Sequence, residues 1–125
     1  MQTRGMTRQH GSVYAEEPYP YSAATNVSTL TTLLNWTDMG SDWASLAFHL
    51  DNTDVTNTCT LIVEASQGSL RANDRQQTYV VPLSREGSIE IGPPNLYTFY
   101  RISAQTVSPS FPVVSIKWAV TGQRR

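Results

Sequence analysis

The sequence has little cysteine and little charge. Cys59 is the only cysteine among the 125 residues, so no internal disulfide can hold the chain together and a hydrophobic core must do so. Charged residues make up 15% of the chain, whereas typical domains have about 25%. The net charge of −1 supplies no overall field that would attract nucleic acid or an anionic membrane. We therefore expect neither of these two partners.

The sequence also lacks long apolar runs and helical periodicity. No stretch approaches the roughly 18–20 apolar residues of a membrane-spanning helix, and no long segment repeats apolar residues at a helical spacing. The crossover helices that a parallel sheet needs are therefore missing, and we expect antiparallel sheets. The length of 125 residues suits one domain.

From residue 27 onward the pattern that is present is that of strands and turns. Between Trp43 and Leu50, and again between Cys59 and Ser66, apolar and polar side chains alternate with the period of two that a half-buried strand requires. About seven such segments follow one another: 27–36, 43–50, 59–66, 79–83, 87–91, 96–106 and 113–120. This spacing predicts an all-β fold, an antiparallel β-sandwich over residues 27–125. The predicted core is Leu46, Phe48, Leu61, Val63, Ile102, Ile116 and Trp118.

Residues 1–26 differ in character and predict an extended N-terminal arm. Pro18 and Pro20 favour an extended path. Tyrosines supply apolar area with a polar tip, and arginines can donate charge-assisted hydrogen bonds, both of which suit an interface. We predict that the arm lies against a neighbouring protein, and not on its own core, through Arg4, Arg8, Tyr14, Tyr19 and Tyr21. The alternative is that these tyrosines pack on the sandwich of the same chain.

Few residues suggest catalysis or metal binding. Cys59 and His49 fall on opposite faces of their strands, which speaks against a Cys–His pair. Asp51 and Asp54 share a turn signal and offer only part of a calcium loop. Glu64 and Glu90 are expected on solvated strand faces, and His49 on an outer face. We expect a protein that is not an enzyme and that holds neither a cofactor nor a metal.

The tryptophans leave one ligand-binding hypothesis open. Trp118 falls on the inner face of the last strand and is expected in the core. Trp36 and Trp43 flank one turn, where they could stack on a sugar or another ligand. A surface module for carbohydrate therefore remains an alternative to a structural role.

One stretch resembles a known group of proteins. Trp43 to Asp54, with its Asn52-Thr53 turn, is followed by a strand ending in Val63-Glu64-Ala65-Ser66-Gln67-Gly68. The pattern is completed by the segment Tyr100-Arg101-Ile102-Ser103-Ala104 and by the apolar strand from Val113 to Val120. Over residues 43–121 this pattern resembles the small immunoglobulin-like sandwiches of tailed-bacteriophage virion proteins, and most of all a capsid decoration, or cement, protein.

That resemblance implies a function and a location. It implies a viral structural protein that binds the outside of a phage capsid and bridges capsid subunits, with the arm as an anchor. The implied partner is the major capsid protein or another virion protein, and the implied place is the capsid surface after synthesis in the host cytoplasm. The low charge and the Thr-rich strand faces, which cost little to bury, predict a homo-oligomer. The resemblance implies that this oligomer is a trimer. Tail, head-completion and connector subunits use similar sandwiches and remain alternatives.

Overall fold

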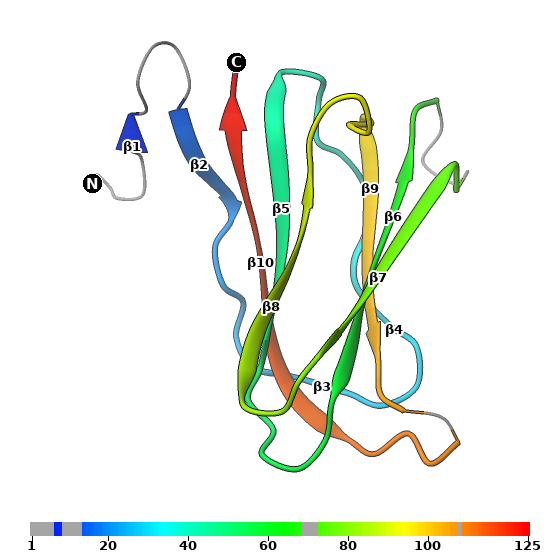
Figure 1. Cartoon of the computed structure of the whole chain (residues 1–125). Coiled ribbons are helices and arrows are strands. Elements are labelled where there is room, and N and C mark those ends of the chain that lie inside the picture. Colours follow the sequence, from blue (N-terminus) through cyan, green and yellow to red (C-terminus); the bar gives the residue numbers. More distant parts are fainter. Residues whose placement is uncertain (1–6, 9–13, 69–72, 108) are drawn as a thin grey trace.

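The computed structural model describes residues 7–8, 14–68, 73–107 and 109–125. These residues form ten strands in two antiparallel sheets and no helix, which confirms the predicted all-β sandwich (Figure 1). The seven strands expected from the sequence correspond to β4 (Thr31–Asp38), β5 (Trp43–Asn52), β6 (Cys59–Ser66), β7 (Arg75–Val81), β8 (Arg85–Ile91), β9 (Phe99–Gln105) and β10 (Val114–Arg124). The other three are β1 (Thr7–Arg8), β2 (Tyr14–Tyr19) and β3 (Thr25–Val27).

Each sheet has a simple strand order. The six-stranded sheet runs β1-β2-β10-β5-β8, with β3 also paired to β10. The four-stranded sheet runs β4-β9-β6-β7, so β4 and β7 are its edges. Pro82 follows directly after β7, which agrees with the expectation that a proline marks an edge strand or a strand end. No helix in the part of the chain that the structure describes is long and apolar enough to span a membrane.

The core lies between the two sheets and contains the residues that the alternation predicted. Six of the seven predicted core residues are buried, and Trp118 is partly exposed but packs against the core. The Phe48 and Tyr100 rings lie 5.1 Å apart across the sandwich. Burial raises the pKa of the Tyr100 phenol, and its hydroxyl accepts a hydrogen bond of 2.7 Å from the Tyr97 N–H. Aromatic packing and the hydrogen bond to the Tyr100 hydroxyl therefore both help to order the core.

The prediction that the arm avoids its own domain is wrong for the described part of residues 1–26. β2 and β3 both pair with β10, and Val27 is buried in the core. The predicted boundary between residues 26 and 27 thus falls inside β3. The physical reason is the length of β10, whose free edge would otherwise leave backbone N–H and C=O groups unpaired. The register on β10 shifts between Val120 and Gly122, opposite Pro18, which has no N–H to donate.

Candidate assembly surfaces

The arm strand is attached to the sandwich through Arg124 near the chain's C-terminal end. Arg124 Nε donates to Glu16 Oε2 of β2 at 2.8 Å, and its guanidinium lies 4.1 Å from the centre of the Trp43 ring. The Trp43 ring is buried and donates through Nε1 to the Met39 carbonyl oxygen at 2.8 Å. Glu16, Arg124 and Trp43 therefore couple β2 to the core, and Trp43 is not available to stack on a ligand.

The five predicted arm residues differ in how much of each the structure describes and in what each one contacts. Arg4 lies outside the described residues, and for Arg8 and Tyr14 only the strand backbone is described. Tyr19 packs on Trp118 with ring centres 5.7 Å apart. Tyr21 is 44% exposed and lies 6.4 Å from the His49 ring. Tyr19 thus follows the alternative in which the arm packs on its own sandwich, and the partner-binding role of the five residues stays a prediction.

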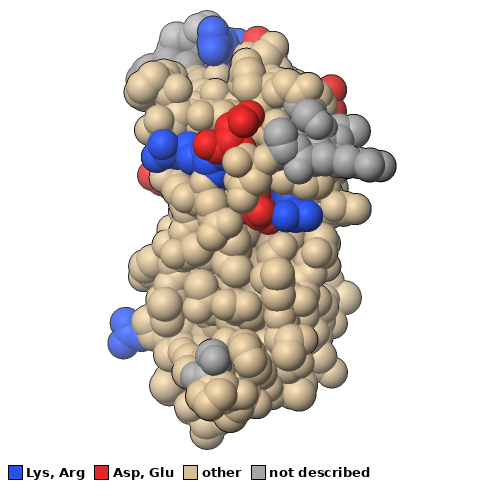
Figure 2. Space-filling model, turned by 90° about the vertical axis from the view of Figure 1, so that its right-hand side faces the viewer, with Lys and Arg blue, Asp and Glu red and all other residues tan. Residues whose placement is uncertain are grey.

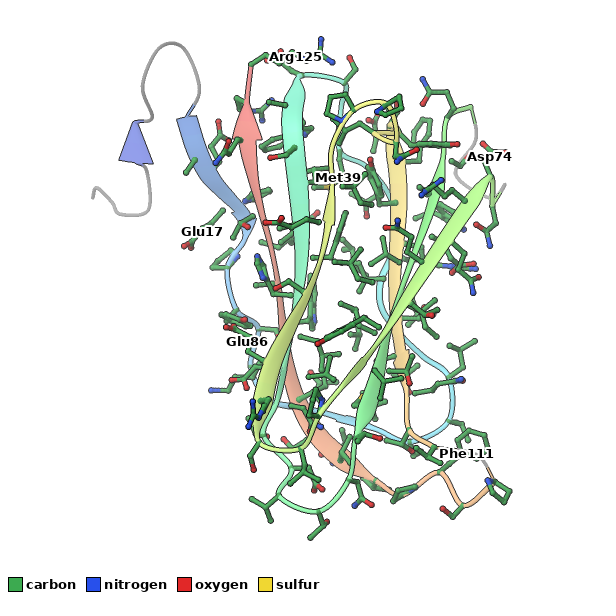
Figure 3. The ribbon with its side chains drawn as sticks, viewed as in Figure 1. Glu17, Met39, Asp74, Glu86, Phe111 and Arg125 are labelled. Carbon is green, nitrogen blue, oxygen red and sulfur yellow. The ribbon has the colours of Figure 1, made fainter. Side chains whose placement is uncertain are left out.

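A hollow of about 200 Å³ lies between the arm and the outer face of the six-stranded sheet. Glu17, Pro20 and Tyr21 line it from the arm side, and His49, Glu86, Ala119 and Thr121 line it from the sheet. Figure 3 labels Glu17 on β2 and Glu86 near the start of β8. Both His49 nitrogens are hydrogen-bonded, Nδ1 with Ser88 Oγ at 2.6 Å and Nε2 with Thr121 Oγ1 at 2.8 Å.

The protonation of His49 follows from this position. Desolvation lowers the pKa of His49, while the charges of Glu90 and Glu17 act in the opposite direction. A histidine whose pKa is lower in the folded than in the unfolded state favours folding above its unfolded pKa. That contribution is lost as the pH falls from the unfolded pKa through the folded pKa. Cys59 is buried inside the sandwich while His49 lies on its outer face, so the two do not meet.

On the outer face of the four-stranded sheet, Glu64 departs from the expectation of a solvated carboxylate. Glu64 is only 8% exposed, because Arg101 Nε and Nη2 donate to its two oxygens at 2.7 and 2.8 Å. The Asn73 amide donates to the same carboxylate at 2.9 Å, and the Arg101 guanidinium lies 5.1 Å from the centre of the Trp36 ring. The paired acceptors hold the pKa of Arg101 above its usual value. Trp36 is therefore engaged within the chain.

Cys59 is a buried thiol and its chemistry can be predicted. Its side chain is 0% exposed, and desolvation raises the pKa of the thiol to about 11. Thiolate is the reactive form, so a buried and protonated thiol is inert. We expect the native protein to resist a thiol-specific reagent at mildly alkaline pH and to react with one equivalent after unfolding in guanidinium. Rapid stoichiometric labelling of the native protein, followed spectroscopically, would contradict the burial of Cys59.

Exposed apolar side chains gather at one end of the sandwich, which we call the apolar end. It consists of four loops, 28–30, 53–58, 82–84 and 106–113, of which residue 108 is not described. These loops join strands at the end opposite the C-terminus (Figure 1). The exposed large apolar residues in the loops are Leu30, Val55, Leu83, Val107 and Val113, at 43–69% exposure. Contiguous exposed apolar residues are typical of interaction surfaces.

Charged side chains are rare at the apolar end. Asp54 is the only charged residue in the sequence of the four loops, and its carboxylate accepts hydrogen bonds from the backbone N–H groups of Thr56 and Asn57. The three ion pairs found among the described residues, Arg101–Glu64, Arg124–Glu16 and Arg124–Asp42, lie away from these loops. Figure 2 shows the same separation, with charged side chains gathered in the upper half of the face and a lower half that is almost wholly uncharged.

Hydrogen bonds hold the loops of the apolar end together. The Ser84 N–H donates to the Asp54 carbonyl oxygen at 2.8 Å, and the Thr106 N–H donates to the Ser28 carbonyl oxygen at 2.9 Å. The side chain of Asn52 is fully buried and donates to the Asn57 carbonyl oxygen at 2.9 Å. The apolar end was not predicted from the sequence. The signal available was that each of these turn segments contains a valine or a leucine.

The other surfaces of the described residues offer less for chemistry. No group of three or more His, Cys, Asp or Glu side chains in the described part of the chain could hold a metal ion. Asp51 and Asn52 belong to the end of β5, so the turn predicted over Asp51 to Asp54 begins only at Thr53. Hydrogen bonds from Thr56 and Asn57 lower the pKa of Asp54. The observed sites are thus surfaces and packing networks, and the arrangement suits protein contacts.

Comparisons with known proteins support the fold and nothing beyond it. No family model matches the sequence, and no curated protein matches it. Among solved structures, one similar chain belongs to work describing Bacillus endospore appendages as a novel family of disulfide-linked pili. The similarity has a TM-score of 0.53 at 12% sequence identity and covers 98% of this chain and 97% of that one. At this identity the similarity establishes a shared β-sandwich fold.

Proposed function

We propose that this protein is a structural subunit of a virion that binds the outside of a phage capsid and stabilises the shell by bridging capsid subunits. The observation that supports a structural role is the apolar end. Its exposed apolar side chains lie on loops that hydrogen bonds hold together, and such a surface fits a protein partner better than a small molecule. The choice of a capsid rests on the resemblance of residues 43–121 to virion sandwiches. The proposed partner is the major capsid protein or another virion protein, and no catalysis is assigned.

The proposal has a simple physical basis. A capsid repeats one binding site many times, and a rigid sandwich at each site gains from multivalent attachment. A subunit that binds only the assembled shell stabilises that shell by mass action. In this proposal the anchor is the arm, with Arg4 and Arg8 donating charge-assisted hydrogen bonds to the capsid. β1 and β2 lie at one side of the six-stranded sheet, which fixes the place of the arm on the sandwich.

Purified particles of the source phage test the proposal. We expect the chain in intact virions at a fixed ratio to the major capsid protein, measured by quantitative mass spectrometry, and accessible to an antibody on the outside. Adding the protein to particles that lack it should raise the temperature at which the shell opens. The matched control is particles incubated with an unrelated sandwich domain of the same size. Absence of the chain from virions, or its presence only on tails, would contradict the capsid assignment.

The structural neighbour favours one second candidate, a subunit of an extracellular appendage. That neighbour is described as belonging to disulfide-linked pili, whereas Cys59 of this chain is buried and could not form a bridge without unfolding. Such a subunit would have to assemble through non-covalent contacts alone. Filaments formed by the purified protein, seen by electron microscopy, would favour this candidate over the capsid.

The remaining alternatives lack an observation in their favour. A tail subunit would be found only on tails, and a head-completion or connector subunit only where head and tail join. A carbohydrate-binding module was expected to use Trp36 and Trp43, but Trp43 is buried and Trp36 faces Arg101. Neither ring is presented as a free stacking platform.

A further inference from the structure

We infer that the apolar end is a contact surface between copies of this chain, so that the loop ends of several copies meet around the axis of a closed oligomer. The inference rests on the proposed role as a structural subunit and names the partner of one of its surfaces. Five large apolar side chains lie exposed to water in these loops. Such exposure is unfavourable for an end that contacts only solvent. Burying these side chains at a contact removes apolar area from water, which stabilises the contact by about 25 cal/mol per Å².

The charges at this end select a second copy as the partner. The centre of the surface carries no charge except Asp54, whose carboxylate is already hydrogen-bonded by its own loop. At the rim, β8 begins with Arg85 and Glu86, which are exposed, opposite in sign and without an ion pair among the described residues. A two-fold contact places the same surface on both sides, and around a three-fold axis one part of this surface meets another part of it. Such a surface meets its own copy without like-charge repulsion and offers nothing to a strongly charged partner.

Hydrogen bonds also fix the conformation of the loops before any partner binds. Thr53 donates to the Ser115 carbonyl oxygen through its hydroxyl at 2.6 Å, and the Thr106 hydroxyl donates to the Ser28 carbonyl oxygen at 3.0 Å. Hydrogen-bonded loops lose little conformational entropy when they bind, so more of the burial energy remains as affinity. Ser84 and Phe111 are the described non-glycine residues with positive φ, at 55° and 45°, and both lie in this end. Backbone conformations of this kind concentrate at functional sites.

The position of the apolar end fits an assembly. It lies at the end opposite the C-terminus (Figure 1), and on the face shown in Figure 2 most charged side chains gather away from it. An axis through this end does not cover the long edges of the sheets, which are β1 and β8 in the six-stranded sheet and β4 and β7 in the other. The edge that carries β1 and β2 is therefore left for other contacts while the loop ends hold the copies together.

Sedimentation of the full-length protein tests the inference. We expect the wild type to sediment as a closed oligomer, with the mass reporting whether it is the trimer implied above or a dimer. The variant Val55→Lys with Val113→Lys places charges at two exposed positions, and burying them at a like-chain contact is costly. We expect this variant to associate about a hundredfold more weakly, which corresponds to about 2.8 kcal/mol.

A matched variant and a second assay make the outcomes distinct. Ser41→Lys with Gln67→Lys adds the same charge at exposed positions of the opposite end, and its association should equal that of the wild type. Circular dichroism checks that both variants are folded. A wild type that stays monomeric at high concentration, or a Val55/Val113 variant that associates as tightly as the wild type, overturns the inference. Virions that contain the chain would still support the proposed function, whereas an oligomer absent from virions would refute only that function.

Discussion

Substituting Gly122 with alanine is expected to lower the free energy of unfolding by about 3 kcal/mol. A Cβ at this position would lie 2.6 Å from Trp43 Cζ3, 2.7 Å from Trp43 Cε3 and 2.9 Å from Leu46 Cδ2. Neither side chain can move aside easily, because both are buried and the Trp43 indole is hydrogen-bonded to the Met39 carbonyl oxygen. Only a glycine allows β10 to pass this closely beneath the ring.

Thermal and urea unfolding of the full-length protein measure this effect. A loss of that size should lower Tm by about 10 °C. Gly68→Ala is the matched control, since a Cβ there meets no atom within 4 Å and Tm should stay within a few degrees of the wild type. Equal stability of the two variants would show that Trp43 does not rest on Gly122. Since Arg124 covers the same ring, Gly122→Ala should also loosen the attachment of β2.

The period of two in the sequence was sufficient to predict β5 to β10 and nearly all of the core, whereas the segment that contains β4 was predicted from its Thr-rich, β-branched composition. A half-buried strand must alternate, so the faces of β5 and β6 could be assigned without knowing their neighbours. Trp118 shows the limit of this reasoning. It points inward at the edge where β2 joins β10, so it is only partly covered and packs on Tyr19. Alternation predicts which way a side chain points, and the neighbouring strands determine how deeply it is buried.

Features that depend on strand pairing could not be read from the sequence. Glu64 and Arg101 lie 37 residues apart and become cross-strand partners only because β6 pairs with β9. Residues 14–27 carry prolines and no alternation, and they become strands because the edge of β10 is open. The apolar end likewise joins four loops that are distant in sequence. Each loop reads as an ordinary turn, and the surface exists only once the strands are paired.

Deleting residues 1–21 is expected to destabilise the isolated domain, contrary to the independent arm that the sequence suggested. The deletion removes β2 and with it the Glu16–Arg124 ion pair and the packing of Tyr19 on Trp118. Trp118 and Ala119 would then be exposed along an unpaired edge of β10. The lost hydrogen bonds and apolar contacts amount to about 3 kcal/mol after the entropy of ordering the strand is recovered. Calorimetry should show a Tm lower by about 10 °C.

Deleting residues 1–13 alone separates the two roles of the N-terminal segment. This shorter deletion keeps β2, Glu16 and Tyr19, and removes only the two-residue strand β1 together with Arg4 and Arg8. We expect its Tm to stay within about 2 °C of the wild type, since β2 and its pairing with β10 are kept. Its affinity for phage capsids should fall at least tenfold if the arginines anchor the arm, because two charge-assisted hydrogen bonds are worth at least 1.4 kcal/mol. Unchanged capsid affinity would remove the anchor from the proposal and leave β2 as a strand of its own sheet. Unchanged Tm after deletion of residues 1–21 would instead mean that β2 contributes nothing to the fold, and the arm would again be an independent segment.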